Sequence, residues 1–194
     1  MKEILRLGLV LGVISTVSVG LLGTVNELTK PIVANQKEES QQLAMQAILT
    51  DANTFEKIDL KQEGVVTEVY KGIGKQNYVG AVAKITPEGY GGTIEALVGI
   101  SPEGTVVGIE ILSHIETPGL DANASQVSFK DQYKGKVAPL SVVKGNTGES
   151  EISAITGATI TTRAITEGVN TAVEVIQTYQ ENWKTGEDQS EKAD

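Results

Sequence analysis

The sequence predicts an α+β protein, in which one N-terminal transmembrane helix precedes an antiparallel sheet and a long C-terminal helix packed on that sheet. Three observations predict it. Residues 7–26 form an uncharged run, residues 64–112 show strand-like patterns joined by short turns, and apolar residues recur at helical spacing over 161–183. Strands grouped first, with a helix on one face, are typical of the α+β class. The length of 194 residues suits one ordinary domain with an extra segment.

The composition excludes several kinds of site. The formal net charge of −9 makes the whole chain a poor candidate for nucleic-acid binding, which normally needs a basic face. The chain has no cysteine, so disulfides, thiolate metal sites, iron–sulfur ligation and a lipid-modified N-terminal cysteine are excluded. A metal site is also not expected, because His114 is the only histidine.

The N-terminus predicts a membrane anchor. The uncharged run from Leu7 to Asn26 would form a helix of roughly 30 Å, enough to cross a hydrocarbon core. A cleaved signal peptide is the alternative, but the run exceeds a usual signal core and Ile32-Val33-Ala34 is no clean cleavage site. Lys2 and Arg6 precede the run, which predicts a cytoplasmic N-terminus and a domain on the extracytoplasmic side of a bacterial cell membrane.

The predicted organisation beyond the anchor starts with a connector helix, which Thr29 would cap and Pro31 would begin. The alternative is a connector helix that is continuous with the anchor. A folded domain follows, and then a charged tail without large apolar residues, which predicts disorder. The predicted boundaries are 1–28 for the cytoplasmic end and anchor, 29–54 for the connector, 55–184 for the domain and 185–194 for the tail.

Four β-rich runs predict an antiparallel meander, because short turns join them. The turn at 101–104 has proline and glycine where a hairpin favours them. The chain then predicts a short helix over 124–132, a strand over 137–143 and a long helix over 161–183 with one apolar stripe. The four predicted strands are 65–70, 78–85, 93–100 and 105–112.

A hydroxyl-rich stretch, residues 153–162, directly precedes the last helix and holds five Ser or Thr residues with one glycine. Hydroxyls and glycine at a helix start favour anion binding, because the first backbone N–H groups lack helical partners and the dipole favours negative charge. The alternative is that Thr161 or Thr162 only caps the helix.

Two other segments are weak indicators by themselves. A lone His114 beside a loop is more often a hydrogen-bonded residue than a catalytic one, and no G-x-S-x-G segment accompanies it. Gly89-Tyr90-Gly91-Gly92 taken alone indicates a tight turn. The chain contains neither G-x-G-x-x-G nor a P-loop lysine, so these patterns predict no catalytic residue and no nucleotide fold of those types.

Together these segments carry a resemblance. Gly89-Tyr90-Gly91-Gly92, His114-Ile115-Glu116-Thr117-Pro118-Gly119-Leu120 and Thr156-Gly157-Ala158-Thr159 occur in this order after a single anchor. The chain thereby resembles the G subunit of the Rnf electron-transport complex. It is similar also to the C subunit of the sodium-pumping NADH:quinone reductase, which belongs to the same FMN-binding domain family. The resemblance covers nearly all residues from the anchor to Trp183 and makes 55–184 an FMN-binding domain.

The resemblance implies a covalent cofactor. In that family a flavin transferase joins FMN through its phosphate to the last threonine of the motif, which here is Thr159. The phosphodiester would lie at the start of the last helix, with Arg163 nearby. Other cofactor-binding residues implied or inferred are Thr156, Gly157, Ala158, Thr161, Thr162, His114, Glu116, Thr117, Gly119, Leu120 and Tyr90. Two positions depart from the family pattern: Ser153 replaces an acidic residue of the transferase motif, and Asp121 replaces a glycine.

The function implied is that of an electron-transfer subunit in an ion-translocating ferredoxin:NAD oxidoreductase, without a stand-alone active site. The implied partners are the other subunits of an Rnf-type complex, the flavin transferase and the lipid bilayer. Two alternatives stay open. One is a membrane-tethered accessory or ligand-binding domain without flavin, and the other is an FMN domain that serves extracellular electron transfer outside an Rnf complex.

Overall fold

The computed structural model describes residues 2–59, 64–75, 77–114, 127–145 and 147–185. By its internal contacts the chain divides into two units, 1–42 and 43–194. The first unit is helical throughout its described part, and the second holds the sheet and the remaining helices.

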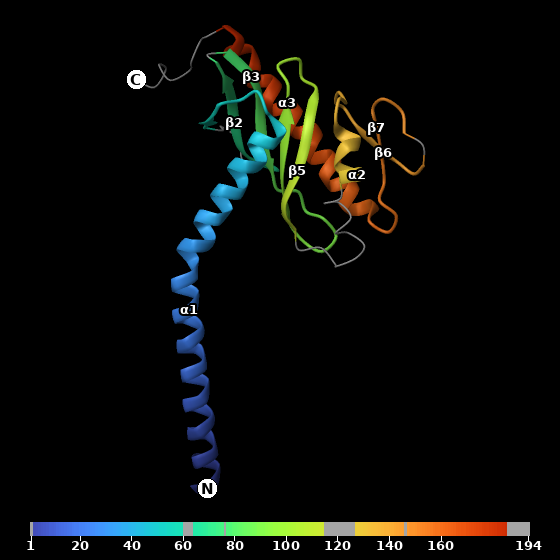
Figure 1. Ribbon diagram of the computed structural model, residues 1–194. Helices are drawn as coiled ribbons and strands as arrows, with labels where there is room; N and C mark the ends of the chain where they lie inside the picture. Colours follow the sequence, from blue (N-terminus) through green and yellow to red (C-terminus); the bar gives the residue numbers. More distant parts are fainter. Residues whose placement is uncertain (1, 60–63, 76, 115–126, 146, 186–194) are drawn as a thin grey trace. The chain divides into compact units, whose positions relative to one another are not determined.

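Helix α1 runs without interruption over Lys2–Ile48 (Figure 1). Of the two expectations for the connector, a helix continuous with the anchor is confirmed, and no new helix begins at Pro31. Pro31 lies inside α1, and the Thr29 hydroxyl donates to the carbonyl oxygen of Val25 at 2.8 Å, as a mid-helix threonine does. Proline removes one hydrogen bond of the helix, but it does not end this helix. α1 contains a stretch that is long and apolar enough to cross a membrane, and none of that stretch is buried within the chain.

The second unit is built on a five-stranded antiparallel sheet in the order β1-β2-β3-β4-β5. The predicted meander is confirmed, and an additional strand, β1, lies at its edge. Gly168 of the C-terminal helix has no side chain, which allows the helix to approach the sheet closely. A Cβ atom at this position would lie 2.8 Å from Ile85 Cδ1 on β3. The strands are β1 Thr54–Ile58, β2 Val66–Gly74, β3 Asn77–Ile85, β4 Ile94–Ile100 and β5 Val106–His114.

The main core lies between one face of this sheet and α3 (Thr159–Thr185). The apolar stripe expected for the last helix is confirmed for five of its seven members, which are at most 1% exposed and pack on the sheet, whereas Tyr179 and Trp183 are half-buried. Each buried isoleucine or valine of the stripe contributes about 1.5–3 kcal/mol relative to its exposed state. The buried stripe consists of Ile165, Val169, Ala172, Val173 and Ile176.

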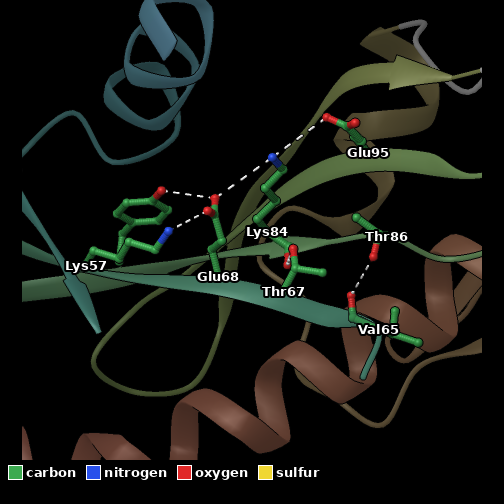
Figure 2. A network of polar contacts seen from close by, with 8 residues as sticks. Lys57, Val65, Thr67, Glu68, Lys84, Thr86 and Glu95 are labelled. Carbon is green, nitrogen blue, oxygen red and sulfur yellow. Dashed lines mark hydrogen bonds and ion pairs between the residues drawn. The ribbon is translucent and has the colours of Figure 1, made fainter. Parts of the chain in front are cut away.

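The opposite face of the sheet has two parts. Met45, Leu49 and Ala52 cover Val82 and Leu97 in a second, smaller apolar cluster. Beside it, charged side chains of four neighbouring strands form a network of ion pairs centred on Glu68 (Figure 2). The members of this Glu68 network are Lys57 on β1, Glu68 and Tyr70 on β2, Lys84 on β3 and Glu95 on β4.

A small layer lies against the first half of α3 (Figure 1). Asn170 of α3 holds it by pairing with both backbone groups of Leu140, at 2.8 and 2.9 Å. The strand expected over 137–143 is shorter and covers Ser141–Val143 only, and β7 was not expected. Of the helix expected over 124–132, residues 124–126 lie outside the described residues. The layer consists of α2 Val127–Lys130, the 3₁₀ turn η2 Asp131–Tyr133, and the parallel strands β6 Ser141–Val143 and β7 Glu151–Ser153.

Candidate functional site

The Thr-Gly-Ala-Thr segment forms a turn that leads directly into α3. The Ala158 N–H donates to the Ile155 carbonyl at 2.9 Å, and Gly157 has φ of 86°, which glycine adopts without strain. The Thr162 N–H then donates to the Ala158 carbonyl at 3.0 Å, the first bond of the helix. Ala158 is therefore the cap position and Thr159 the first helical residue.

The prediction that Thr161 or Thr162 caps α3 is wrong, because the turn starts the helix two residues earlier. Both threonines are fully buried. The Thr162 hydroxyl accepts the Ile155 N–H at 3.2 Å and donates to the Ala158 carbonyl at 2.9 Å. Through these two hydrogen bonds the buried Thr162 side chain stabilises the turn.

Thr156 and Thr159 differ from these buried threonines. Thr156 is exposed and Thr159 is half-buried, and within the described part of the chain neither hydroxyl has a hydrogen-bond partner. Arg163 lies one helical turn after Thr159, is exposed, and has no ion-pair partner among those same residues. Ala158 has no side-chain oxygen with which to cap the helix. Within the part of the chain that the structure describes, the start of α3 therefore presents an unpartnered hydroxyl, an unpaired guanidinium and the positive end of the helix dipole.

A cavity of about 350 Å³ adjoins the turn at Thr156. Its wall comes from three segments: the α2–η2 segment, β7 and the start of the turn. Ser153 of β7 donates its N–H to Gln132 Oε1 at 2.8 Å, and this bond joins two of those segments. The lining residues are Ser128, Phe129, Gln132, Ser153, Ala154, Ile155 and Thr156.

Other predicted site residues lie in two places. His114 ends β5, opposite Ile94, and is half-buried. Tyr90 is 71% exposed in a turn closed by a bond from the Gly89 N–H to the Gly92 carbonyl at 2.9 Å. Among the described site residues, 156–162 lie together as one segment at the start of α3. Glu116, Thr117, Gly119, Leu120 and the departing Asp121 lie outside the described residues.

The sequence patterns do not indicate Gln132 and Ser128 as residues of the cavity wall. Gln132 meets Ser153 across 21 positions through a bond to a backbone N–H, so no local pattern indicates it. The weak helical pattern around residue 128 was the only indication that this segment is ordered.

Comparisons with known proteins identify the domain family and the fold of this chain. Residues 89–174 match the FMN-binding domain family, and residues 1–48 match the RnfG N-terminal region. The fold agrees with the solved structure of NqrC from Shewanella oneidensis (TM-score 0.55, 22% identity, 70% of this chain and 73% of that one). It also agrees with the C subunit of the Na⁺-translocating NADH-quinone reductase from Parabacteroides distasonis (TM-score 0.54, 17% identity, 75% and 92%). The chain therefore has an FMN-binding domain after an N-terminal helix.

Two relatives define the family more closely. The G subunit of the proton-translocating ferredoxin:NAD⁺ oxidoreductase complex of Clostridium ljungdahlii is 39% identical, over 82% of this chain and 84% of the relative. The G subunit of the Na⁺-translocating complex of Acetobacterium woodii is also 39% identical, over 91% and 93%. The chain belongs to the G-subunit family of Rnf-type ion-translocating oxidoreductase complexes, which confirms the resemblance and the fold class predicted from the sequence.

Proposed function

We propose that this chain is the membrane-anchored electron-transfer subunit of an Rnf-type ferredoxin:NAD oxidoreductase complex, with FMN covalently attached to Thr159. The family membership and the FMN-binding domain support the electron-transfer role. One structural observation carries the choice of Thr159: it is only half-buried and its hydroxyl has no partner within the described residues, whereas Thr161 and Thr162 are buried.

The helix start suits a phosphodiester. A phosphate on Thr159 would lie at the positive end of α3, and Arg163, four residues later, is on the same face of the helix. The two groups that would attract the phosphate, the helix dipole and the guanidinium, are thus supplied by one element. The Thr156 hydroxyl also has no partner among the described residues, but Thr156 lies in the turn and outside the helix. Attachment at Thr159 is therefore favoured over attachment at Thr156.

Attachment is a phosphoryl transfer. The Thr159 oxygen forms a bond to the flavin phosphate and loses its proton, while a leaving group departs from the same phosphorus. The donor must therefore be an activated flavin phosphate, such as a pyrophosphate-linked dinucleotide, and a flavin transferase must supply the catalysis. The chain itself supplies an accessible hydroxyl on a rigid turn, which Gly157 and Thr162 define.

The attached FMN supplies the redox chemistry, and the protein supplies position and electrostatics. No side chain of the site is required as a general acid or base. The covalent bond keeps the cofactor on the extracytoplasmic side, where we place the domain because Lys2 and Arg6 precede the uncharged run. The partners are then the other subunits of the complex and the bilayer.

One rival function is a tethered accessory domain without flavin, which Ser153 in place of the usual acidic residue favours. Co-expression of the full chain with a flavin transferase, followed by a denaturing gel under ultraviolet light, separates the two. We expect a fluorescent band near 20.5 kDa in the wild type. The band should vanish in Thr159→Val and persist in Thr159→Ser and in the matched control Thr156→Val. An unlabelled wild type would support the accessory function instead, and labelled Thr159→Val would move the attachment site.

A further inference from the structure

The first two turns of α3 have an outward face with one exposed apolar side chain. Ile160 directly follows Thr159 and is 56% exposed, and no other large apolar residue is exposed among the α3 positions whose burial the structure describes. Arg163 and Glu167 follow three and seven positions later, so all three side chains share one face of the helix. A single exposed isoleucine is ordinary on a protein surface, but this one adjoins the hydroxyl that we propose to react.

A hollow of about 190 Å³ lies beside this face, between α3 and the segment of β6. Asn170 pairs with both backbone groups of Leu140, at 2.8 and 2.9 Å, and thereby fixes the two sides of the hollow relative to each other. Within the described ranges, the Ser141 hydroxyl and the Glu167 carboxylate have no side-chain partner. These acceptor oxygens suit a basic side chain of another molecule. The lining residues are Leu140, Ser141, Val142, Arg163, Thr166 and Glu167.

Thr159 is held in this surface by the turn before it. The Ala158 N–H donates to the Ile155 carbonyl, the Thr162 hydroxyl accepts the Ile155 N–H, and α3 continues from Thr159 as one helix. For the attachment reaction, the Thr159 oxygen must come within bonding distance of the flavin phosphorus in the active site of the transferase. The transferase must therefore contact the folded surface around Thr159, where Ile160 is the exposed apolar side chain.

On the basis of the proposed attachment at Thr159, we propose that the first two turns of α3 and the adjoining hollow are the docking surface for the flavin transferase. Ile160 inserts into an apolar recess of that enzyme, and a basic side chain of the enzyme enters the hollow and pairs with Glu167. The charge of Arg163, which also lines the hollow, is compensated by the flavin phosphate. The formal net charge of −9 favours a partner with a basic face, because opposite charges accelerate the encounter.

The test measures how fast a purified flavin transferase labels the full-length protein in detergent, with a pyrophosphate-linked flavin dinucleotide as donor. Ile160→Ala should lower kcat/KM by about tenfold through a higher KM at unchanged kcat, because a docking contact is lost. Glu167→Lys should lower kcat/KM similarly and weaken its salt dependence. Two matched controls should label with nearly wild-type kinetics: Val137→Ala, at a similarly exposed position, and Glu174→Lys, further along the same face of α3.

A competition assay separates docking from chemistry. Thr159→Val cannot be labelled but keeps the docking surface, so an excess of it should inhibit labelling of the wild type. The double variant Thr159→Val/Ile160→Ala should inhibit much less. Circular dichroism shows whether each variant is folded, and Ile160→Ala should fold normally because the side chain is exposed.

Wild-type KM values for Ile160→Ala and Glu167→Lys, or an equal loss in Glu174→Lys, would overturn the docking surface and leave the attachment intact. Normal labelling of both variants combined with slower electron transfer through the assembled complex would also overturn it, and would assign this face of α3 to a redox partner. A wild type that stays unlabelled would instead overturn the proposed function.

Discussion

Two polar regions of this molecule differ in how their side chains are satisfied. In the Glu68 network, each charged group has an opposite charge within 4 Å, on a neighbouring strand (Figure 2). At the start of α3, the described structure gives Thr156, Thr159 and Arg163 no partner at all. The contrast teaches that the first region stabilises the sheet, whereas the second has unused hydrogen-bonding capacity for a ligand.

The sheet register explains the satisfied region. Glu68 on β2 lies opposite Lys84 on β3, so opposite charges meet across neighbouring strands. Glu68 and Tyr70 are two residues apart and therefore share a face of the sheet, and the Tyr70 hydroxyl donates to Glu68 at 3.0 Å. Alternation along each strand and pairing between strands together satisfy Glu68 without any ligand.

The largest expected effect distinguishes the hydrogen-bonded Thr162 from the unpartnered Thr159 at the start of α3. Thr162→Val should lower the free energy of unfolding by about 1–3 kcal/mol, because it leaves the Ile155 N–H without its acceptor. Thr159→Val should change it by less than about 0.5 kcal/mol, since its hydroxyl has no partner in the described chain. Urea unfolding of the full chain in detergent, followed by circular dichroism, measures both variants.

Covalent flavin labelling should be more sensitive to the Thr159 substitution than to the Thr162 substitution, the opposite of the order expected for stability. Thr159→Val should lose the covalent flavin, whereas Thr162→Val should retain it below its unfolding midpoint. Equal stability losses for the two variants would contradict the division into a structural and a reactive threonine.

A smaller effect is expected from Glu68→Gln, which keeps the side-chain volume and removes the charge. Lys84 keeps Glu95 as a partner at 3.7 Å, but the pairs of Glu68 with Lys57 and Lys84 are lost. We expect a loss of about 1–2 kcal/mol in urea unfolding, because Glu68 is only partly buried. Flavin labelling should stay at the wild-type level, and a clear loss of label would show that the network does more than stabilise the sheet.

Most of the sheet and the last helix could be predicted from the sequence, because strand alternation, short turns and helical spacing are local patterns. The strand β1 was missed because Thr54–Ile58 offers only Phe55 and Ile58 as apolar positions. The sequence left open whether a helix begins at Pro31 or continues the anchor. Proline is favoured in the first turn of a helix and removes a hydrogen bond in its interior, so the local pattern favours a start, whereas α1 runs through Pro31 without interruption.

The site was partly predictable for the same reason. The motif around Thr159 is contiguous, so its position before a helix could be inferred from the chain alone. The roles of Thr161 and Thr162 depend on where α3 begins, and the positive φ of Gly157 sets that start. The contact of Gln132 with Ser153 joins two segments that only tertiary packing brings together.

The smallest effect is expected at Lys57, the most exposed member of the Glu68 network with 55% of its side chain accessible. Lys57→Met should cost less than about 1 kcal/mol at pH 8, because the pair is exposed to solvent. The hydrogen bond to Glu68 raises the pKa of Lys57 above its usual 10.5. Its contribution to stability is therefore complete below pH 10.5 and is lost as the pH rises through the raised value.

The pH dependence of this lysine separates its ion pair from its packing. As the pH rises from 10.5 through the raised pKa of Lys57, the wild type should lose more stability than Lys57→Met in urea unfolding, since only the wild type has the lysine proton to lose. Burial also raises the pKa of Tyr78, to about 12, but that group acts equally in both proteins and cancels in the difference. Parallel losses in the two proteins would mean that the Lys57–Glu68 pair does not contribute to folding.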